Sequence, residues 1–176
     1  MQSHIGVGVG KYIEEEFEKT KDSLWIATPI ITSKIAKKII AMAKNGIKIR
    51  IITSSRITEE SERANILISK FCKEEIKEKS EPGINLKIIN HNEVPMIHAK
   101  IFVFDQKTVI MGSVNLAESH FWKYAEYIWV IDETEFVDQT INDYETLWSS
   151  YNHSELDLNE TKRKSKNLVR RLKRKI

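Results

Sequence analysis

The sequence predicts an α/β fold in which a mixed β-sheet is flanked by helices on both faces. In the first half of the chain, short apolar segments alternate with amphipathic helical patterns, which is typical of parallel strands joined by helices. In the second half, two apolar segments flank a short polar turn at Asp105, which predicts an antiparallel hairpin. The length of 176 residues is sufficient for one domain with its own core.

The alternating half is predicted from periodicity and from residues that begin or end helices. Apolar residues at helical spacing indicate helices, and unbroken or alternating apolar segments indicate strands. Thr32-Ser33 caps the second helix and Asn45-Gly46 ends it, while Pro82-Gly83 ends the third. The predicted order is helix 11–20, strand 23–28, helix 34–44, strand 47–53, helix 58–78 and strand 84–89.

The second half contains the hairpin and one further strand and helix. The segment 99–104 is almost wholly apolar and predicts the first hairpin strand, and Asp105 stands where a tight turn begins. Residues 116–124 are predicted to be irregular or briefly helical. A strand at 125–131 and a helix at 135–151 follow.

The chain divides into three parts by composition. Residues 1–10 are rich in glycine and are predicted to be flexible, residues 11–155 form the folded domain, and residues 156–176 form a basic, helical tail. The net charge is +3, but residues 161–176 carry nine of the 28 basic residues and no acid. Three interpretations of the tail stay open: a contact to phosphate backbones, a contact to an anionic membrane, or a solvated helix with one packed stripe.

Composition also limits the class of protein. The one cysteine, Cys72, excludes an intramolecular disulfide and fits a reducing compartment. No apolar stretch approaches the ~18 residues of a membrane span, and the first ten residues lack the pattern of a signal peptide. We therefore expect a cytoplasmic protein and do not expect a membrane as its main partner.

Four polar residues near the hairpin have the spacing of an oxyanion site. His98 and Lys100 are two residues apart on a predicted strand, so their side chains leave the same face. Ser113 and Asn115 share that spacing. An imidazole, an ammonium and an amide directed at one point would bind a phosphate.

Each residue also has a structural interpretation. His98 alone could be a core histidine, and Asp105 could simply stabilise the turn. Burying the Lys100 ammonium on so apolar a strand is costly without an anion. Glu126 is the single acid in an otherwise apolar strand, so it either has a buried partner or faces water at a sheet edge.

The pattern H-x-K-x4-D-x6-G-S-x-N, from His98 to Asn115, resembles the HKD signature of the phospholipase D superfamily at every fixed position. The resemblance implies a phospholipase D-like fold, with residues 11–155 as the catalytic domain. It makes His98 the nucleophile that forms a phosphohistidine, with Lys100 and Asn115 holding the phosphate. Ser113 is then a supporting or phosphate-facing residue, Asp105 a supporting residue, and Glu126 the residue that bonds the second nitrogen of His98.

Further residues are predicted to contact substrate. Gly112 allows a close approach of the backbone. His120 and Lys123 lie between Asn115 and Glu126 and could border the site, although ordinary surface packing explains them equally well. The remaining histidines and Cys72 lack the spacing of metal ligands, so we expect neither a metal nor another cofactor.

The family reaction requires two histidines, and this chain has one H-x-K sequence. Small single-motif members of the superfamily are similar in this respect and form homodimers with one composite site. The resemblance therefore implies a homodimeric, metal-independent phosphodiesterase, with nucleic acid, DNA or RNA, as the first substrate class. A phospholipid-directed hydrolase and a non-catalytic nucleic-acid-binding module are the alternatives.

Overall fold

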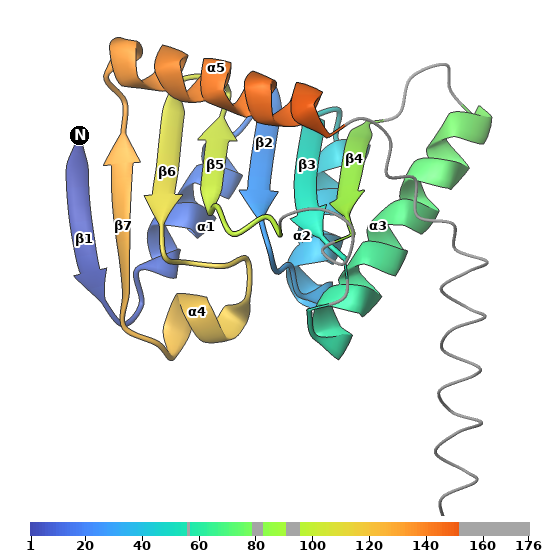
Figure 1. Cartoon of the computed structure of the whole chain (residues 1–176), viewed down its shortest axis with the longest axis horizontal. Helices are drawn as coiled ribbons and strands as arrows, with labels where there is room; N and C mark the ends of the chain where they lie inside the picture. Colours follow the sequence, from blue (N-terminus) through green and yellow to red (C-terminus); the bar gives the residue numbers. More distant parts are fainter. Residues whose placement is uncertain (56, 79–82, 91–95, 152–176) are drawn as a thin grey trace, which may run out of the picture.

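The computed structural model describes residues 1–55, 57–78, 83–90 and 96–151. A seven-stranded sheet with the order β1-β7-β6-β5-β2-β3-β4 forms the centre of the molecule (Figure 1). The strands are β1 (Gln2–Gly6), β2 (Ser23–Thr28), β3 (Lys48–Ser54), β4 (Ile84–Ile89), β5 (Ile101–Phe104), β6 (Thr108–Gly112) and β7 (Glu126–Ile131). The helices are α1 (Gly10–Lys19), α2 (Ser33–Lys44), α3 (Glu59–Glu78), α4 (Glu118–Trp122) and α5 (Thr134–Ser150).

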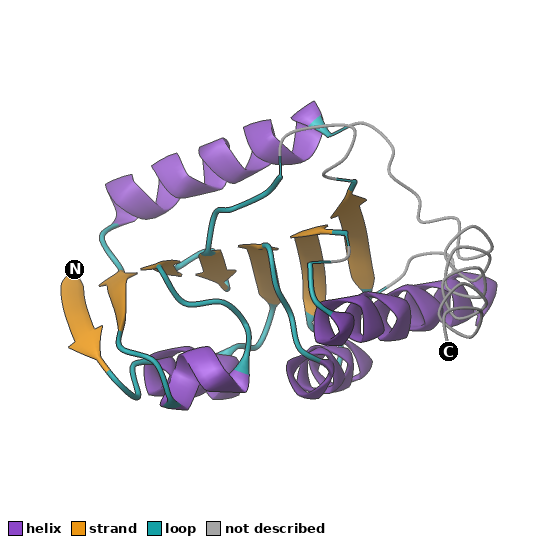
Figure 2. Ribbon diagram, turned by 60° about the horizontal axis from the view of Figure 1, so that its bottom comes forward, coloured by secondary structure: helices purple, strands orange, loops and turns teal. Residues whose placement is uncertain are grey.

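The sheet is mixed, as predicted. β2, β3 and β4 are parallel, because α2 and α3 return the chain to the same end of the sheet. The other four pairs of neighbouring strands are antiparallel. Figure 2 shows α5 on one face and the other four helices on the opposite face, which confirms the predicted arrangement.

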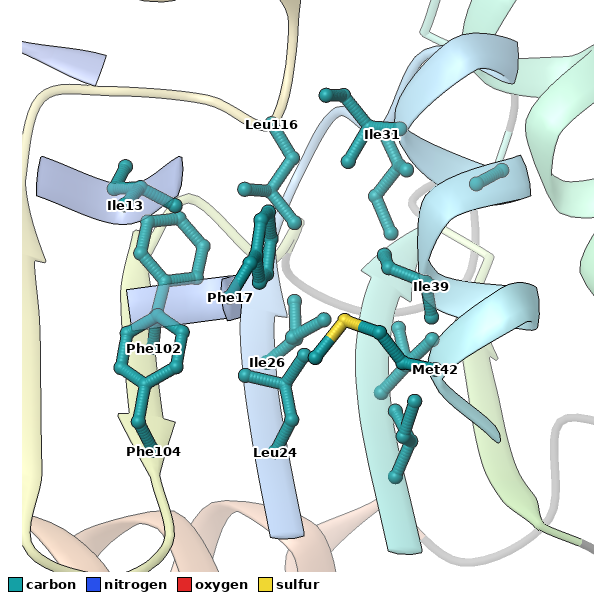
Figure 3. Packing of buried hydrophobic residues seen from close by; sticks show 14 of the residues in the cluster. Ile13, Phe17, Leu24, Ile26, Ile31, Ile39, Met42, Phe102, Phe104 and Leu116 are labelled. Carbon is teal, nitrogen blue, oxygen red and sulfur yellow. The ribbon is translucent and has the colours of Figure 1, made fainter. Parts of the chain in front are cut away.

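Apolar side chains from alternate strand positions fill both layers. On the face of α1 and α2, Leu24 and Ile26 pack with Phe102 and Phe104 (Figure 3). Phe17 of α1 meets the ring of Phe104 edge-on, with a distance of 5.9 Å between the ring centroids. The opposite strand positions form a second cluster with the inner side of α5. Because β2 is completely buried and β5 is buried except at Ile101, their ends can hold polar groups in a fixed place.

Two sequence predictions differ from the structure. Residues 1–10, predicted to be flexible, contain β1, which pairs with β7 along its whole length so that Gly6 lies opposite Glu126. The segment QSHIG has little apolar pattern, because β1 is an exposed edge strand that is stabilised by backbone pairing. The motif strand begins at Ile101, so His98 and Lys100 precede it.

Two further expectations concern the tail and the membrane. The predicted basic helix at 156–176 lies outside the described residues. Within the described residues, every helix is too short or too polar to cross a bilayer.

Packing between α1 and α4 gives a first test, because α4 carries a candidate site residue. A Cβ atom added at Gly10 would overlap both the backbone and the side chain of Phe121. Helix propensity favours alanine over glycine, yet we expect Gly10→Ala to lower the free energy of unfolding by about 1–3 kcal/mol through overpacking. Urea denaturation measures this.

The control for this substitution is Glu18→Ala, at an exposed position of the same helix. We expect this change to stay within about 0.5 kcal/mol of the unsubstituted protein. A Gly10→Ala protein as stable as the control would show that α1 and α4 are not in the close contact described.

Candidate active site

His98 and Lys100 lie together just before β5. The Lys100 Nζ atom donates to the backbone oxygen of His98 at 2.7 Å and lies 3.3 Å from His98 Nδ1. The Lys100 residue is 8% exposed, whereas His98 is exposed. The interpretation of His98 as a core histidine is therefore wrong, and its ring is accessible to a substrate.

The Lys100 ammonium is a cation held in a poorly solvated place. Burial lowers the pKa of Lys100, and the carboxylate of Glu126 acts in the opposite direction. A bound phosphate would add negative charge beside the ammonium and would offset the cost of burying it. The sequence predicted this situation, in which a buried ammonium requires an anion beside it.

The backbone before His98 is held by two polar residues that the sequence analysis missed. The Ser54 hydroxyl donates to the Ile97 backbone oxygen at 3.2 Å, and the Asn65 amide donates to the Ser54 backbone oxygen at 2.9 Å. All three residues are buried. Each of the two side chains acts on a backbone oxygen, so the pattern of side chains along the chain contained no signal for them.

Glu126 is buried and has partners, so the alternative of a water-facing edge carboxylate is wrong. The residue is 9% exposed. Its Oε2 atom accepts a hydrogen bond from the Ser113 hydroxyl, which in turn accepts from the Tyr127 backbone N–H at 3.0 Å. Ser113 therefore supports the carboxylate at the point where β6 ends.

The second oxygen of Glu126 faces His120. The distance from His120 Nδ1 to Glu126 Oε1 is 2.5 Å, and His120 Nε2 lies 3.2 Å from Asn115 Nδ2. The resemblance implied that Glu126 bonds His98, but here His98 Nδ1 faces Lys100 instead. The sequence predicted that His120 borders the site but did not indicate its contact with Glu126. That contact depends on how α4 folds back over the sheet.

The position of α4 is fixed by the loops around it. The Leu116 backbone N–H donates to the Ile30 oxygen at 3.2 Å, and the Thr32 backbone N–H donates to the Leu116 oxygen at 2.9 Å. The Thr32 hydroxyl also donates to Glu118 Oε2 at 2.6 Å. These bonds tie the segment after β6 to the end of β2, so this segment and α4 are held at the same end of the sheet (Figure 1).

Gly112 has a structural reason to be glycine. A Cβ atom there would overlap the Tyr127 backbone oxygen and would lie 2.9 Å from Ile128 Cα. Glycine thus allows β7 to approach β6 where Ser113 and Glu126 meet. Lys123, the other predicted substrate contact, is exposed just after α4.

Asp105 lies at the far end of β5, in the hairpin turn. Its carboxylate accepts hydrogen bonds from the backbone N–H groups of Lys21, Asp22 and Ser23 at 2.8–3.2 Å. Burial alone would raise the pKa of Asp105, but these donors and Lys107 hold it below its usual value. Asp105 therefore links the hairpin turn to the start of β2, in agreement with a supporting role.

Together these groups make two connected sets at one end of the sheet. His98 and Lys100 form the first, and Ser113, Glu126, His120 and Asn115 form the second, with Lys100 and Glu126 in electrostatic contact. In the described ranges, no group of three His, Cys, Asp or Glu residues has the arrangement of a metal site. Fold and site define an α/β protein with an exposed histidine beside a buried lysine ammonium.

A family model described as "Cardiolipin synthase, PLD-like domain" matches residues 13–148. The chain therefore belongs to the phospholipase D superfamily, whose members are generally phosphodiesterases. A curated "Phospholipase D" of Rickettsia prowazekii (strain Madrid E) is 28% identical over 139 residues. The match covers 78% of this chain but 61% of that protein, so the chain spans less than two thirds of the length of this relative.

Solved structures share the fold. NucT from Helicobacter pylori superposes with a TM-score of 0.64 at 20% sequence identity, covering 85% of this chain and 96% of that one. Nuc from Salmonella typhimurium, a phospholipase D family member, gives a TM-score of 0.66 at 20% identity, with 84% and 94% covered. These matches confirm the predicted phospholipase D-like fold.

The Asp105 contacts predict a change in stability with pH. Because the pKa of Asp105 is lower in the folded chain than the unfolded value of about 3.9, its ionised form stabilises the fold at neutral pH. This contribution is lost as the pH falls through the folded pKa. We expect Asp105→Asn to be less stable by about 1 kcal/mol at pH 7, and the difference to shrink below pH 4. Thermal melts across this range measure it.

The matched control is Asp138→Asn, at an exposed position of α5. Its melting temperature should follow the unsubstituted protein at every pH. An Asp105→Asn deficit that stayed constant down to pH 2 would mean that the carboxylate charge does not stabilise the turn.

Proposed function

We propose that this protein is a phosphodiesterase that cleaves nucleic acid through a phosphohistidine intermediate at a homodimeric site. The observation that carries the proposal is the exposed His98 ring beside the buried Lys100 ammonium. A nucleophile must be accessible, and the cation that stabilises developing phosphoryl charge is most effective where water is excluded. The bound phosphate would draw Lys100 Nζ toward its oxygens and away from His98 Nδ1.

The reaction proceeds in two displacements. A neutral His98 attacks phosphorus in line, the bond to the leaving oxygen breaks, and the partner subunit's His98 donates a proton to that oxygen. The partner ring then takes a proton from water, and the resulting hydroxide breaks the phosphorus–nitrogen bond. Lys100 and Asn115 of both chains hold the charged phosphoryl oxygens, so these lysines provide the positive charge that a metal ion would provide in other enzymes.

Nucleic acid is favoured as the substrate by two observations. The match covers 96% of NucT and 94% of Nuc, so this chain is similar to them in length, and the sequence resemblance associates single-motif members of this size with nucleases. The basic stretch 161–176 would add contacts to a polyanion. The Rickettsia prowazekii phospholipase D supports a phospholipid substrate as the second candidate.

A homodimer follows from the chemistry, because one H-x-K sequence provides one of the two histidines. Large apolar side chains are exposed near the end of the sheet that carries the site, where they could meet a second copy. They are Ile5, Val7, Met96, Trp122 and Tyr124, with 80, 63, 44, 47 and 52% of each residue exposed. Cytoplasmic location remains a prediction from the sequence.

The first test is catalysis by the full chain in excess EDTA. Single-stranded DNA, double-stranded DNA, RNA and phospholipid vesicles are compared, and we expect a nucleic acid to be cleaved without added metal. His98→Asn should reduce kcat by about 1,000-fold or more while binding to labelled oligonucleotide is retained. The log of the binding constant should fall steeply with the log of the salt concentration.

The control for the first test is His4→Asn, since His4 lies in β1 and stacks on Tyr12 of α1. Turnover of vesicles alone would select the phospholipid candidate. Salt-dependent binding of oligonucleotides without cleavage would show that the protein is a non-catalytic nucleic-acid-binding module.

The second test measures whether both histidines act in one site. Unsubstituted protein is co-refolded with an equal amount of His98→Asn protein, so that subunits mix at random. Activity should fall to about a quarter of that of the same total amount of unsubstituted protein, because only dimers with two intact histidines turn over. A value of about half would show that each chain acts by itself.

A further inference from the structure

His120 lies between two residues of the site. Its Nδ1 atom is 2.5 Å from Glu126 Oε1, and its Nε2 atom is 3.2 Å from Asn115 Nδ2. The His120 side chain is 22% exposed, and the ring of Tyr124 covers it edge-on at 5.2 Å. Both ring nitrogens are therefore engaged by the protein, although the sequence analysis predicted His120 as a substrate contact.

The partners determine where the ring carries its proton. With its nitrogen facing His120, the Asn115 amide can only donate, and Nε2 is then the acceptor. A neutral imidazole that accepts at Nε2 carries its proton on Nδ1, where the Glu126 carboxylate accepts it. An imidazolium would direct a second N–H at Asn115 Nδ2, placing two donors against each other. The buried carboxylate thus fixes the tautomer, and the tautomer fixes the direction of the amide.

The direction of this amide affects the reaction. Asn115 is 7% exposed, and its Oδ1 atom has no hydrogen-bond partner among the described residues. With one N–H of Asn115 directed at His120, the other remains for a ligand. A reversed Asn115 amide would direct its oxygen toward His120. It could then no longer donate one N–H to His120 and the other to a ligand.

We propose that His120 is a positioning residue that holds the Asn115 amide so that its second N–H donates to a phosphoryl oxygen. The Ser113 hydroxyl and the His120 ring together hold the Glu126 carboxylate. This proposal rests on the proposed function, in which Asn115 binds the phosphate. The role is carried by an uncharged ring, whereas the chemistry is carried by His98.

The first experiment needs no turnover. The imidazole nitrogens of the full chain, labelled with 15N, are recorded by NMR at pH 8, and His120 is assigned from the signals missing in His120→Gln. We expect the neutral tautomer with the proton on Nδ1. A proton on Nε2, or an imidazolium, would overturn the proposal even if the enzyme is active.

The second experiment is a double-mutant cycle of His120→Phe and Asn115→Ala, measured as kcat and KM on the substrate identified above. Phenylalanine keeps a ring against Tyr124 but removes both nitrogens. We expect His120→Phe to lower kcat by about 10- to 100-fold with little change in KM. In the Asn115→Ala protein the same change should cost less than about threefold, because its effect passes through the amide.

Controls separate positioning from packing and from substrate contact. His120→Gln retains a donor and an acceptor and should recover most of the lost kcat, whereas His4→Phe should leave kcat unchanged. Additive effects in the cycle, or a loss confined to KM, would overturn the proposal. If no substrate is turned over by the unsubstituted protein, the proposed function fails, and the NMR result alone decides the role of His120.

Discussion

The buried carboxylate of Glu126 is the constraint around which this site is arranged. An ionised carboxylate in so poorly solvated a position is tolerated only when hydrogen-bond donors surround it. Ser113 provides one donor from the end of β6, and His120 provides another from α4. The negative charge also acts on Lys100, which is itself buried. Satisfying one carboxylate therefore brings together the hairpin, the short helix and the residues before β5.

Most of the fold could be predicted because its elements have local signals. The boundaries of β2 and β4 agree with the sequence prediction at every residue, since β2 is a mostly apolar segment and β4 alternates apolar and polar residues, each between clear breaks. β1 could not be predicted, because its stability comes from pairing with β7, more than one hundred residues away, and its side chains are largely exposed. The alternation of apolar and polar residues reflects which side chains are buried. An exposed edge strand buries few side chains and therefore shows little alternation.

The candidate site was predictable in its composition more than in its contacts. The spacing of His98, Lys100, Ser113 and Asn115 located the site, and Glu126 was recognisable as an acid in an apolar strand. The partner of that acid was not recognisable, because it depends on how α4 folds back over the sheet. Ser54 and Asn65 act through the backbone, and a backbone contact leaves no mark in the pattern of side chains.

The hairpin gives a physical meaning to the spacing of the motif. Asp105 and Gln106 both have positive φ angles, 50° and 55°, and Phe104 lies opposite Thr108, so the two arms are of equal length. Continuing this register places Lys100 opposite Gly112, and the Gly112 N–H donates to the Lys100 oxygen at 3.2 Å. The numbers of residues between the fixed positions of the motif thus correspond to the lengths of the two strands of this hairpin. Inserting or deleting one residue in one arm would reverse the face of each side chain beyond it, so the spacing must be kept even where the intervening residues are free to vary.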